Sequence, residues 1–337
     1  MKIQLLIATV DCDYAEHLSN TFAENHSDVI EVSVCSTAEH LSEQLAVRKF
    51  DVALMEMPLI GDIDMQSIRL PLLLWSEEEN AQAVPEEFMK VRKYQRISSM
   101  ISNVLELYAK DTPRERGALS KRAGITVVWS PMGGVGKTTV ALAYSARKAS
   151  EGKQVLYLDL EPFSSVSAYF AEAGKSISTV FEMLETGEGN INVLIRSLRQ
   201  QNGNGDIEYF CRPENFDDMN ILSADNVAAL IDACSEVTDE LVIDMSCMCD
   251  ERTRKAFDLA DRIFLVTDSS RTAQIKFSQF ASQHNVFQRV REKTSLVANR
   301  GAAVGESLAD TIIYLPYVQS TDASAIYRTL SGVSFEV

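Results

Sequence analysis

The chain lacks any apolar stretch close to the roughly 20 residues that a membrane-spanning helix needs. Its apolar start, Met1 to Val10, runs into Asp11 and Asp13, which predicts a first strand rather than a secretion signal. The C-terminal tail is neither basic nor long enough to form an amphipathic membrane helix. We therefore expect a cytoplasmic protein that does not insert directly into a membrane.

Basic residues and cysteines are also scarce. Lys and Arg number 32 against 48 Asp and Glu, and this net charge of −16 argues against nucleic-acid binding, which needs a basic face. The six cysteines fit a reducing compartment. Cys247 and Cys249 form one C-x-C pair, and without a second pair a metal cluster is disfavoured. The remaining composition is that of a globular chain long enough for two domains.

A glycine-rich turn stands between the apolar run Ile125–Trp129 and a helical pattern that begins at Lys137. Residues 130–139 read Ser-Pro-Met-Gly-Gly-Val-Gly-Lys-Thr-Thr. The strict P-loop pattern fails only at its first glycine, where Pro131 stands. Backbone N–H groups of such a turn surround an anion, the lysine reaches the β- and γ-phosphates, and the next hydroxyl binds Mg²⁺. The sequence therefore predicts nucleotide binding by Gly133, Gly134, Val135, Gly136, Lys137, Thr138 and Thr139, with a ligand-free glycine turn as the alternative.

Two later strands end in carboxylates. The run Val155–Leu160 carries Asp159 and is followed by Glu161, and Glu240–Asp244 is an apolar strand that ends in an aspartate. A strand-end aspartate is common by itself. After a phosphate loop and a second acidic strand, Asp244 matches the Walker B arrangement, which holds Mg²⁺ through water.

These motifs resemble the deviant Walker A ATPases typified by MinD, ParA and the nitrogenase iron protein, whose loop reads K-G-G-x-G-K-T-T. Met132 stands where that family has its first lysine. The resemblance implies that this lysine reaches across an ATP-sandwich dimer to the partner's phosphates, which a thioether cannot do. Loss of a finger-type cation costs roughly 10³ to 10⁵ in rate. We therefore expect binding of MgATP with slow or no hydrolysis.

The same resemblance implies roles for the remaining residues. The family's second motif is commonly D-x-D-P; Asp159 keeps its first acid and Glu161 replaces the second. The implied catalytic residues are Lys137, Asp159 and Glu161, and the implied Mg²⁺ residues are Thr138, Asp159 and Asp244. The family's adenine-contacting loops correspond to Asn299, Arg300 and Pro316, although Asn299 could instead cap the end of its strand.

The hydrophobic pattern predicts an α/β protein. Residues 1–110 alternate strands and helices, as in a doubly wound, flavodoxin-like domain. Residues 111–123, with Pro113, predict a linker, and residues 124–337 predict a P-loop NTPase domain with a mostly parallel sheet. Within it we expect a helix over 178–185, a loop over 200–206 and strands over 219–223, 262–267, 294–299 and 311–315.

The N-terminal half resembles a response-regulator receiver with an altered site. Glu56 falls at the position of the phosphate-accepting aspartate, and Asp11 and Asp13 stand near the acidic pair that would hold Mg²⁺. Ser76 and Lys93 fall near the receiver's hydroxyl and lysine. Because the extra methylene of Glu56 moves its carboxylate out of register, we expect a domain that docks partners, with phosphorylation as the alternative.

A degenerate receiver-like domain joined to a deviant Walker A ATPase resembles the TadZ/CpaE family, which helps to localise and assemble Tad (Flp) pili. The resemblance implies a homodimer that binds ATP and Mg²⁺ and contacts pilus assembly or secretion proteins through its N-terminal domain, often at a cell pole. Two alternatives stay open: a cycling positioning ATPase of the MinD or ParA kind, and a signalling protein that uses the receiver-like domain.

Overall fold

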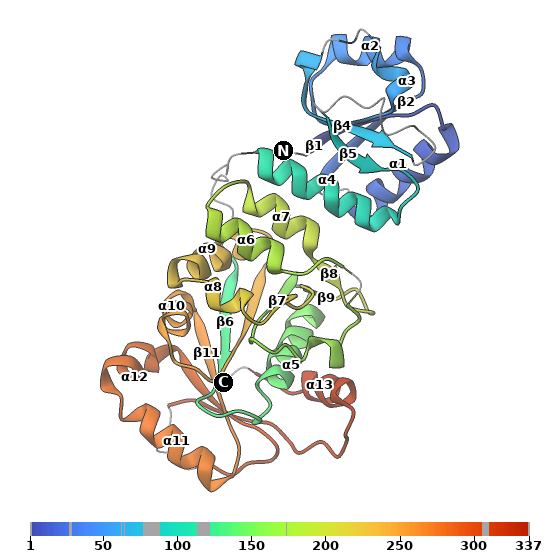
Figure 1. The fold of residues 1–337 in the computed structure, drawn as a ribbon. Helices are drawn as coiled ribbons and strands as arrows, with labels where there is room; N and C mark the ends of the chain where they lie inside the picture. Colours follow the sequence, from blue (N-terminus) through green and yellow to red (C-terminus); the bar gives the residue numbers. More distant parts are fainter. Residues whose placement is uncertain are drawn as a thin grey trace. The chain divides into compact units, whose positions relative to one another are not determined.

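The computed structural model describes residues 2–26, 29–61, 63, 65–76, 88–112, 122–172, 174–304 and 310–335. It divides into two compact units (Figure 1). The first comprises Met1–Glu115 and Glu188–Ser197, and the second comprises Arg116–Gly187 and Leu198–Val337. The domain limits expected from the sequence stay predictions, because residues 113–121 of the expected linker lie outside the described residues.

The first unit contains a five-stranded sheet of order β2-β1-β3-β4-β5 in which all neighbours are parallel. This is the order of flavodoxin-like doubly wound domains. The alternation of strands and helices expected from the sequence is confirmed. The elements are β1 (Ile3–Ala8), α1 (Cys12–His26), β2 (Ile30–Cys35), α2 (Ala38–Val47), β3 (Phe50–Met55), α3 (Met57–Ile60), a 3₁₀ turn (Met65–Ser67), β4 (Ile68–Trp75), β5 (Met89–Arg92) and α4 (Ile97–Asp111).

A helix from much later in the chain is grouped with the first unit and contacts its core. Helix α7 (Ile191–Leu198) is strongly apolar, and all of it but its last residue belongs to this unit. Val193 packs against the apolar cluster that strands β1, β3 and β4 form with α1 and α4. Just before the helix, the Asn190 N–H donates to the Ala109 carbonyl at 2.6 Å. The sequence pattern did not indicate this association.

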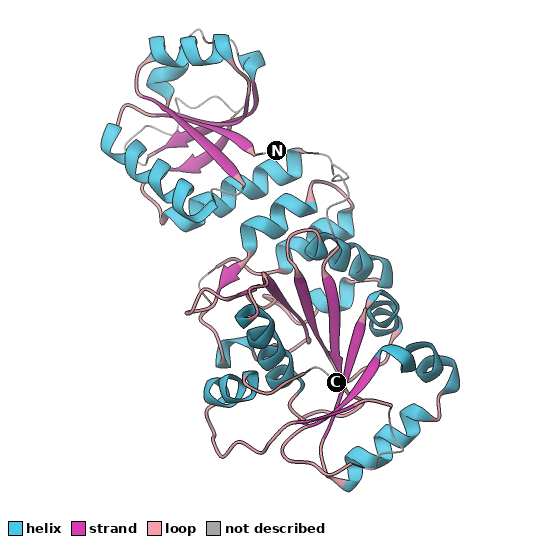
Figure 2. Ribbon diagram, turned by 180° about the vertical axis from the view of Figure 1, so that it is seen from behind, coloured by secondary structure: helices cyan, strands magenta, loops and turns pink. Residues whose placement is uncertain are grey.

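The second unit is built on an eight-stranded sheet of order β13-β12-β11-β6-β10-β7-β9-β8. All neighbours are parallel except β8, which runs antiparallel to β9 (Figure 2). The predicted mostly parallel sheet is therefore confirmed. Its strands are β6 (Gly124–Trp129), β7 (Val155–Leu160), β8 (Gln200–Gln201), β9 (Ile207–Tyr209), β10 (Glu240–Met245), β11 (Arg262–Thr267), β12 (Thr294–Ala298) and β13 (Ile312–Tyr314).

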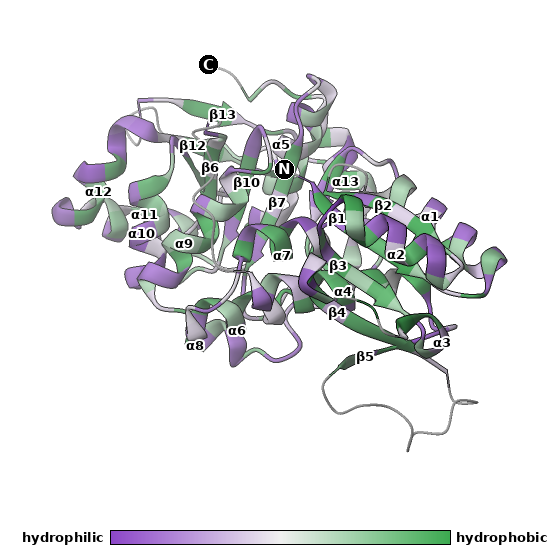
Figure 3. Cartoon of the chain, turned by 90° about the horizontal axis from the view of Figure 1, so that it is seen from above, coloured by the Kyte–Doolittle hydropathy of each residue, from purple (hydrophilic) through white to green (hydrophobic). Residues whose placement is uncertain are grey.

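Helices cover both faces of this sheet, so its central strands are apolar on both sides (Figure 3). Helices α5 and α13 pack together on one face, where Tyr144 and Tyr327 are buried. On the other face Trp129 contacts Phe257 and Phe280. The helices are α5 (Lys137–Ser150), α6 (Ser178–Thr186), α8 (Asp218–Ile221), α9 (Ala224–Ser235), α10 (Glu251–Leu259), α11 (Arg271–Ala281), α12 (His284–Val290) and α13 (Ala323–Ser331), with 3₁₀ turns at Val166–Ala168 and Arg291–Lys293. None of the helices in the described ranges is both long and apolar enough to cross a membrane.

Two local expectations are wrong. Residues 219–223, expected as a strand, fall largely in the short helix α8, whose Asn220 and Ile221 N–H groups both donate to the Asp217 carbonyl. A short apolar run cannot by itself distinguish strand from helix. The expected loop at 200–206 begins instead with strand β8, which pairs with β9 as a hairpin.

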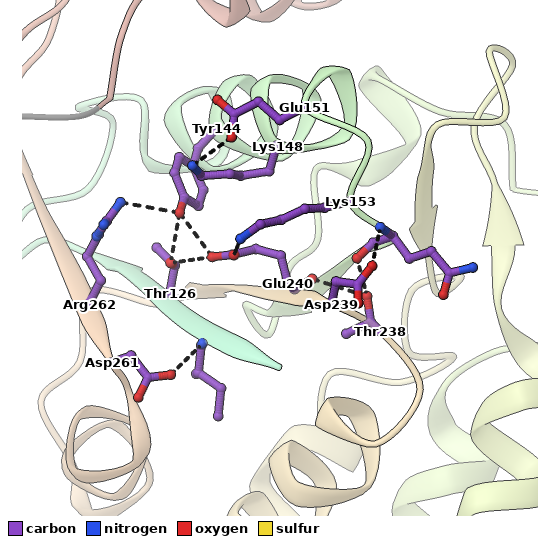
Figure 4. A network of polar contacts seen from close by, with 12 residues as sticks. Thr126, Tyr144, Lys148, Glu151, Lys153, Thr238, Asp239, Glu240, Asp261 and Arg262 are labelled. Carbon is purple, nitrogen blue, oxygen red and sulfur yellow. Dashed lines mark hydrogen bonds and ion pairs between the residues drawn. The ribbon is translucent and has the colours of Figure 1, made fainter. Parts of the chain in front are cut away.

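A buried polar network lies at the amino ends of strands β6 and β10 (Figure 4). The Glu240 side chain accepts hydrogen bonds from the Tyr144 and Thr126 hydroxyls, each at 3.0 Å, and pairs with Lys153 at 2.7 Å. Burial and the neighbouring Glu240 charge raise the pKa of Tyr144. Because parallel strands run in one direction, this network lies at the edge opposite to the one that carries the phosphate loop.

Candidate functional site

The glycine-rich turn links the carboxyl end of β6 to the amino end of α5 (Figure 1). Gly134 and Gly136 adopt left-handed backbone angles, with φ of +76° and +90°. These angles are readily available only to glycine. The turn thus delivers the chain to the start of a 14-residue helix, whose first N–H groups have no partners within the helix and favour an anion.

A cavity of about 400 Å³ opens over this turn. Eight residues predicted from the sequence line it: Gly133, Gly134, Gly136, Lys137, Thr138, Thr139, Glu161 and Arg300. Six further lining residues were not predicted: Pro162, Phe163, Ser165, Tyr169, Ser246 and Cys247. They follow strand ends or lie in loops, where no local pattern marks them; of these, Tyr169 is fixed by a 3.0 Å hydrogen bond to the Thr139 hydroxyl.

Lys137 points into a set of carboxylates. Its ammonium lies 2.9 Å from Glu161 Oε1, and the lysine is only 7% exposed. Burial alone would lower the pKa of Lys137, but the hydrogen bond and charge of Glu161 raise it. The phosphate-loop lysine is therefore charged and already paired with an anion.

The parallel register brings the two acidic strands together, because Asp244 of β10 pairs directly with Asp159 of β7. Carboxylate oxygens of Asp159, Glu161 and Asp244 all lie within 4.8 Å of one another. Burial is the main reason that the pKa of Asp159 rises to about 7 and that of Asp244 rises well above its usual range. The mutual repulsion of these acids adds to both shifts.

The cluster fits a magnesium ion. Asp244 is fully buried; its Oδ2 accepts from the Tyr157 hydroxyl at 3.0 Å, while Oδ1 has no hydrogen-bond partner among the described residues. The Thr138 hydroxyl is close enough to this carboxylate to oppose the rise in its pKa. An unpaired carboxylate oxygen beside a hydroxyl and a second carboxylate is a hard oxygen ligand set of the kind Mg²⁺ prefers. Thr138, Asp159 and Asp244 could hold the ion next to the phosphates, where it would offset their charge.

Met132 turns away from the cavity. Its side chain is 4% exposed and packs in the apolar cluster that includes Val135 and Val140. Its N–H donates to the Ser130 hydroxyl at 3.2 Å. The position at which the resemblance expects a cation is thus occupied by a buried apolar side chain.

Asn299, Arg300 and Pro316 come from the ends of strands β12 and β13. The Asn299 side chain donates to the Val135 carbonyl at 2.9 Å, and Arg300 donates to the Gly134 carbonyl at 2.7 Å. Pro316 is exposed next to the Tyr317 backbone, which lies against Gly301. The structure thus brings the first two residues to the phosphate loop, but of the three only Arg300 lines the cavity.

The first unit contains the residues that the sequence predicted as an altered receiver site. Glu56 pairs with Lys93 at 2.5 Å and accepts the Val10 N–H at 2.9 Å. Asp11 lies 3.6 Å from Lys93 and accepts the Tyr94 hydroxyl at 2.8 Å. Burial opposes the charge of Lys93, yet its bonds to Glu56 and Tyr94 raise its pKa. Of the other two predicted members, Asp13 is exposed in the first turn of α1, and Ser76 follows β4.

One protein-family model, described as AAA domain, matches residues 124–296, just over half of the chain. No curated protein matches the chain. Among solved structures, a ParA family ATPase from Chlorobium tepidum TLS is 16% identical with a TM-score of 0.52, over 63% of this chain and 91% of that one. The ParA-type P-loop ATPase fold expected for the second unit is thereby confirmed.

Two further structures are similar at lower scores. The septum site-determining protein MinD from Pyrococcus horikoshii OT3, complexed with Mg-ADP, has a TM-score of 0.47 and 13% identity, over 62% of this chain and 94% of that one. Cobyrinic acid a,c-diamide synthase from Mycobacterium smegmatis, with a bound ATP analog and magnesium, has a TM-score of 0.44 and 17% identity, over 62% and 93%.

Proposed function

The chain belongs to the AAA domain family, and from this membership we propose that it is a MgATP-binding scaffold of the TadZ/CpaE kind. In this proposal it acts in the cytoplasm, in assembly of a Tad (Flp) pilus, at a cell pole chosen by its partners. It binds MgATP in the cavity over the phosphate loop and hydrolyses it slowly or not at all. Support comes from the built phosphate loop, the cavity and the carboxylate cluster that fits Mg²⁺.

The burial of Met132 carries the proposal. A cation at this position would have to leave the loop and reach the phosphates of a second molecule, but Met132 is apolar and packed inward. Phosphoryl transfer depends chiefly on positioning and on charge stabilisation of the transition state. A site that keeps its metal ligands and its loop lysine but lacks this cation is suited to holding ATP rather than to turning it over.

ATP then acts as a structural ligand. Saturating nucleotide stabilises the folded state by RT ln(1 + [L]/Kd), about 2.7 kcal/mol at a hundredfold excess over Kd. Dimerisation without the signature lysine has to rely on apolar contacts. Phe163, which lines the cavity and is 79% exposed, stacks on Phe216, which is 48% exposed, with ring centroids 5.6 Å apart. This exposed aromatic pair supports a nucleotide-dependent homodimer through the same face.

The first unit has the role of choosing partners among pilus assembly or secretion proteins. Glu56 is 4% exposed and already engaged by Lys93 and the Val10 N–H, which supports docking over phosphate acceptance. Intact-mass analysis after treatment with acetyl phosphate tests this role. We expect no phosphoryl adduct on the first unit, and an adduct that disappears in Glu56→Gln would instead establish a signalling protein.

The deciding experiment measures MgATP binding and phosphate release by the wild type, Met132→Lys and Lys137→Ala. We expect the wild type to bind MgATP with little turnover, Lys137→Ala to lose binding, and Met132→Lys to gain turnover. Melting curves are needed for all three proteins, because a lysine at the buried position 132 must reorient to stay solvated. A wild type that binds no MgATP would refute the proposal.

A cycling positioning ATPase is the second candidate, and one observation favours it. Asp159, Glu161 and Asp244 keep a complete acidic cluster beside Lys137, which is more than nucleotide binding alone requires. Robust wild-type phosphate release that is abolished in Lys137→Ala would select this candidate and would mean that another cation replaces the lysine.

A further inference from the structure

Two successive carbonyl groups of the phosphate loop are held from strand β12. Asn299 Nδ2 donates to the Val135 carbonyl at 2.9 Å, and an Arg300 guanidinium nitrogen donates to the Gly134 carbonyl at 2.7 Å. These donors are adjacent in sequence and lie more than 160 residues beyond the loop. The contacts are therefore a tertiary connection rather than part of the local turn.

One donor and one acceptor of the Asn299 amide are used inside the protein. Its nitrogen is bonded to Val135, its Oδ1 accepts the Arg300 N–H at 2.8 Å, and the residue is only 4% exposed. A side chain that reads a base must present a donor and an acceptor edge to the ligand. Asn299 directs these two groups to the phosphate-loop backbone and to its own neighbour, and it is not among the residues that line the cavity.

Arg300 is held in an uncommon conformation that serves the same contact. Its φ is +60°, a left-handed angle that costs a residue other than glycine free energy and persists only where the surroundings enforce it. Here the Gly301 N–H bonds to the Leu315 carbonyl at 2.8 Å, and Asp268 lies 3.7 Å from the guanidinium. The ends of strands β11, β12 and β13 together fix where Arg300 points.

We propose that Asn299 and Arg300 are positioning residues for the phosphate loop rather than readers of the base. By holding the Gly134 and Val135 carbonyls outward, they keep the negative ends of these peptide dipoles away from the phosphates. The N–H groups of the loop then face the anion. The inference rests on the proposed function, since it assigns these residues a part in binding the triphosphate.

A positioning role and a base-reading role predict different changes in affinity across a set of ligands. A positioning residue acts on the triphosphate, so Asn299→Ala lowers the affinities for MgATP, MgGTP and magnesium tripolyphosphate by the same factor. Loss of one such hydrogen bond corresponds to about tenfold. A base reader would lower the affinity for MgATP and leave that for tripolyphosphate unchanged.

The first measurement needs no ligand, and it is amide hydrogen exchange over residues 132–139 in nucleotide-free protein. We expect Asn299→Ala and Arg300→Met each to raise exchange in this segment about tenfold. Arg300→Lys should stay within twofold of the wild type, because a lysine can also donate to one carbonyl. Arg289→Met is the matched control. Arg289 is an exposed arginine on α12 that pairs with Asp258, and its removal should leave exchange in the phosphate loop unchanged.

The second measurement is competition of the three magnesium-bound ligands against a fluorescent ATP analogue on the same variants. Equal factors for all three support positioning, and a loss confined to MgATP overturns it. Unchanged loop exchange in Arg300→Met also overturns it, even if Asn299→Ala misfolds, because Arg300 is half exposed and its replacement leaves the core intact. A wild type that binds no nucleotide would instead refute the proposed function and leave the exchange result to decide the positioning role.

Discussion

The ammonium of Lys137 and the carboxylate of Glu161 lie 2.9 Å apart, so the lysine that would meet the phosphates is already neutralised by the chain itself. Glu161 stands where the resembling family has an aspartate, and its extra methylene lengthens the reach of the carboxylate. A nucleotide entering the cavity must therefore compete with Glu161 for this lysine. The Glu161 carboxylate thus pairs with the lysine that a phosphate group would otherwise bind.

Removing that competitor should tighten anion binding. We expect Glu161→Gln to bind ADP without Mg²⁺ about tenfold more tightly, since a neutral amide releases Lys137 at little steric cost. Omitting the metal separates this effect from any role of Glu161 near Mg²⁺. Isothermal titration of both proteins measures it. Glu151→Gln, which alters a lysine-paired glutamate at the far end of α5, is the control. An affinity that does not change would show that the ion pair offers no competition.

The carboxylate cluster should make the nucleotide-free protein less stable as the pH rises. Burial raises the pKa of Asp159 from 3.8 to about 7, so between these values the folded state binds more protons than the unfolded state. This stabilising contribution is complete below about pH 4 and is lost as the pH approaches 7. We expect the free energy of unfolding to fall by on the order of 1–3 kcal/mol between pH 4 and 8.

Denaturant titrations of the wild type and Asp159→Asn across this range check the slope. The variant should have a smaller slope, because only the raised pKa of Asp244 remains, whereas an identical slope in both proteins would contradict the assignment to Asp159. Because Mg²⁺ needs the ionised carboxylates, addition of Mg²⁺ should restore stability mainly above pH 7.

Gly136 should be irreplaceable for a reason beyond its backbone angle. A Cβ at this position would lie 2.5 Å from Asn299 Nδ2, whereas a Cβ on Gly152, which has a similar φ of +84°, would meet nothing within 4 Å. Both Gly136→Ala and Gly152→Ala should lose about 1 kcal/mol from backbone strain. Only Gly136→Ala should also lose MgATP affinity, by a hundredfold or more. Equal affinities of the two variants would refute the close approach of Asn299.

The network around Glu240 should contribute to stability and not to ligand binding. Tyr144→Phe removes one hydrogen bond to a buried carboxylate at the edge of the sheet remote from the cavity. Bonds to charged groups are worth about 1.5–3 kcal/mol, so we expect a loss of this size in the free energy of unfolding. MgATP affinity, measured well below the melting temperature, should stay within twofold. A larger change in affinity would show that the two edges of the sheet are energetically coupled and would contradict this prediction.

The pair of Glu56 and Lys93 offers a test confined to the first unit. Lys93→Met leaves a carboxylate that is 4% exposed without its counter-ion, which costs about 3–5 kcal/mol for buried pairs. The double variant Glu56→Gln, Lys93→Met should regain a large part of that loss, since no uncompensated charge remains. Thermal melts of the four proteins of this cycle measure the coupling, and additive effects would contradict a direct ion pair.

Local motifs in the sequence were sufficient to predict eight of the residues that line the cavity. The glycines before Lys137 predict a phosphate loop. Carboxylates at the ends of strands lie side by side when the strands are parallel neighbours, as those of Asp159 and Asp244 do. The inward packing of Met132 and the attachment of Asn299 to the loop could not be predicted, because both depend on contacts between distant segments. The strand expected at 219–223 was wrong because three apolar residues within a five-residue segment fit either period.

Helix α7 is grouped with the first unit, although it follows several elements of the second unit in the sequence. The core that Val193 contacts begins with strand β1, so this contact cannot form before the ribosome has made residue 193. By then β6, the phosphate loop, α5 and β7 of the second unit have already emerged. The contact of α7 with the first unit therefore forms only after part of the second unit has been made. A recombination event that exchanged the segment before residue 112 alone would bring the new unit into contact with the α7 of the original chain.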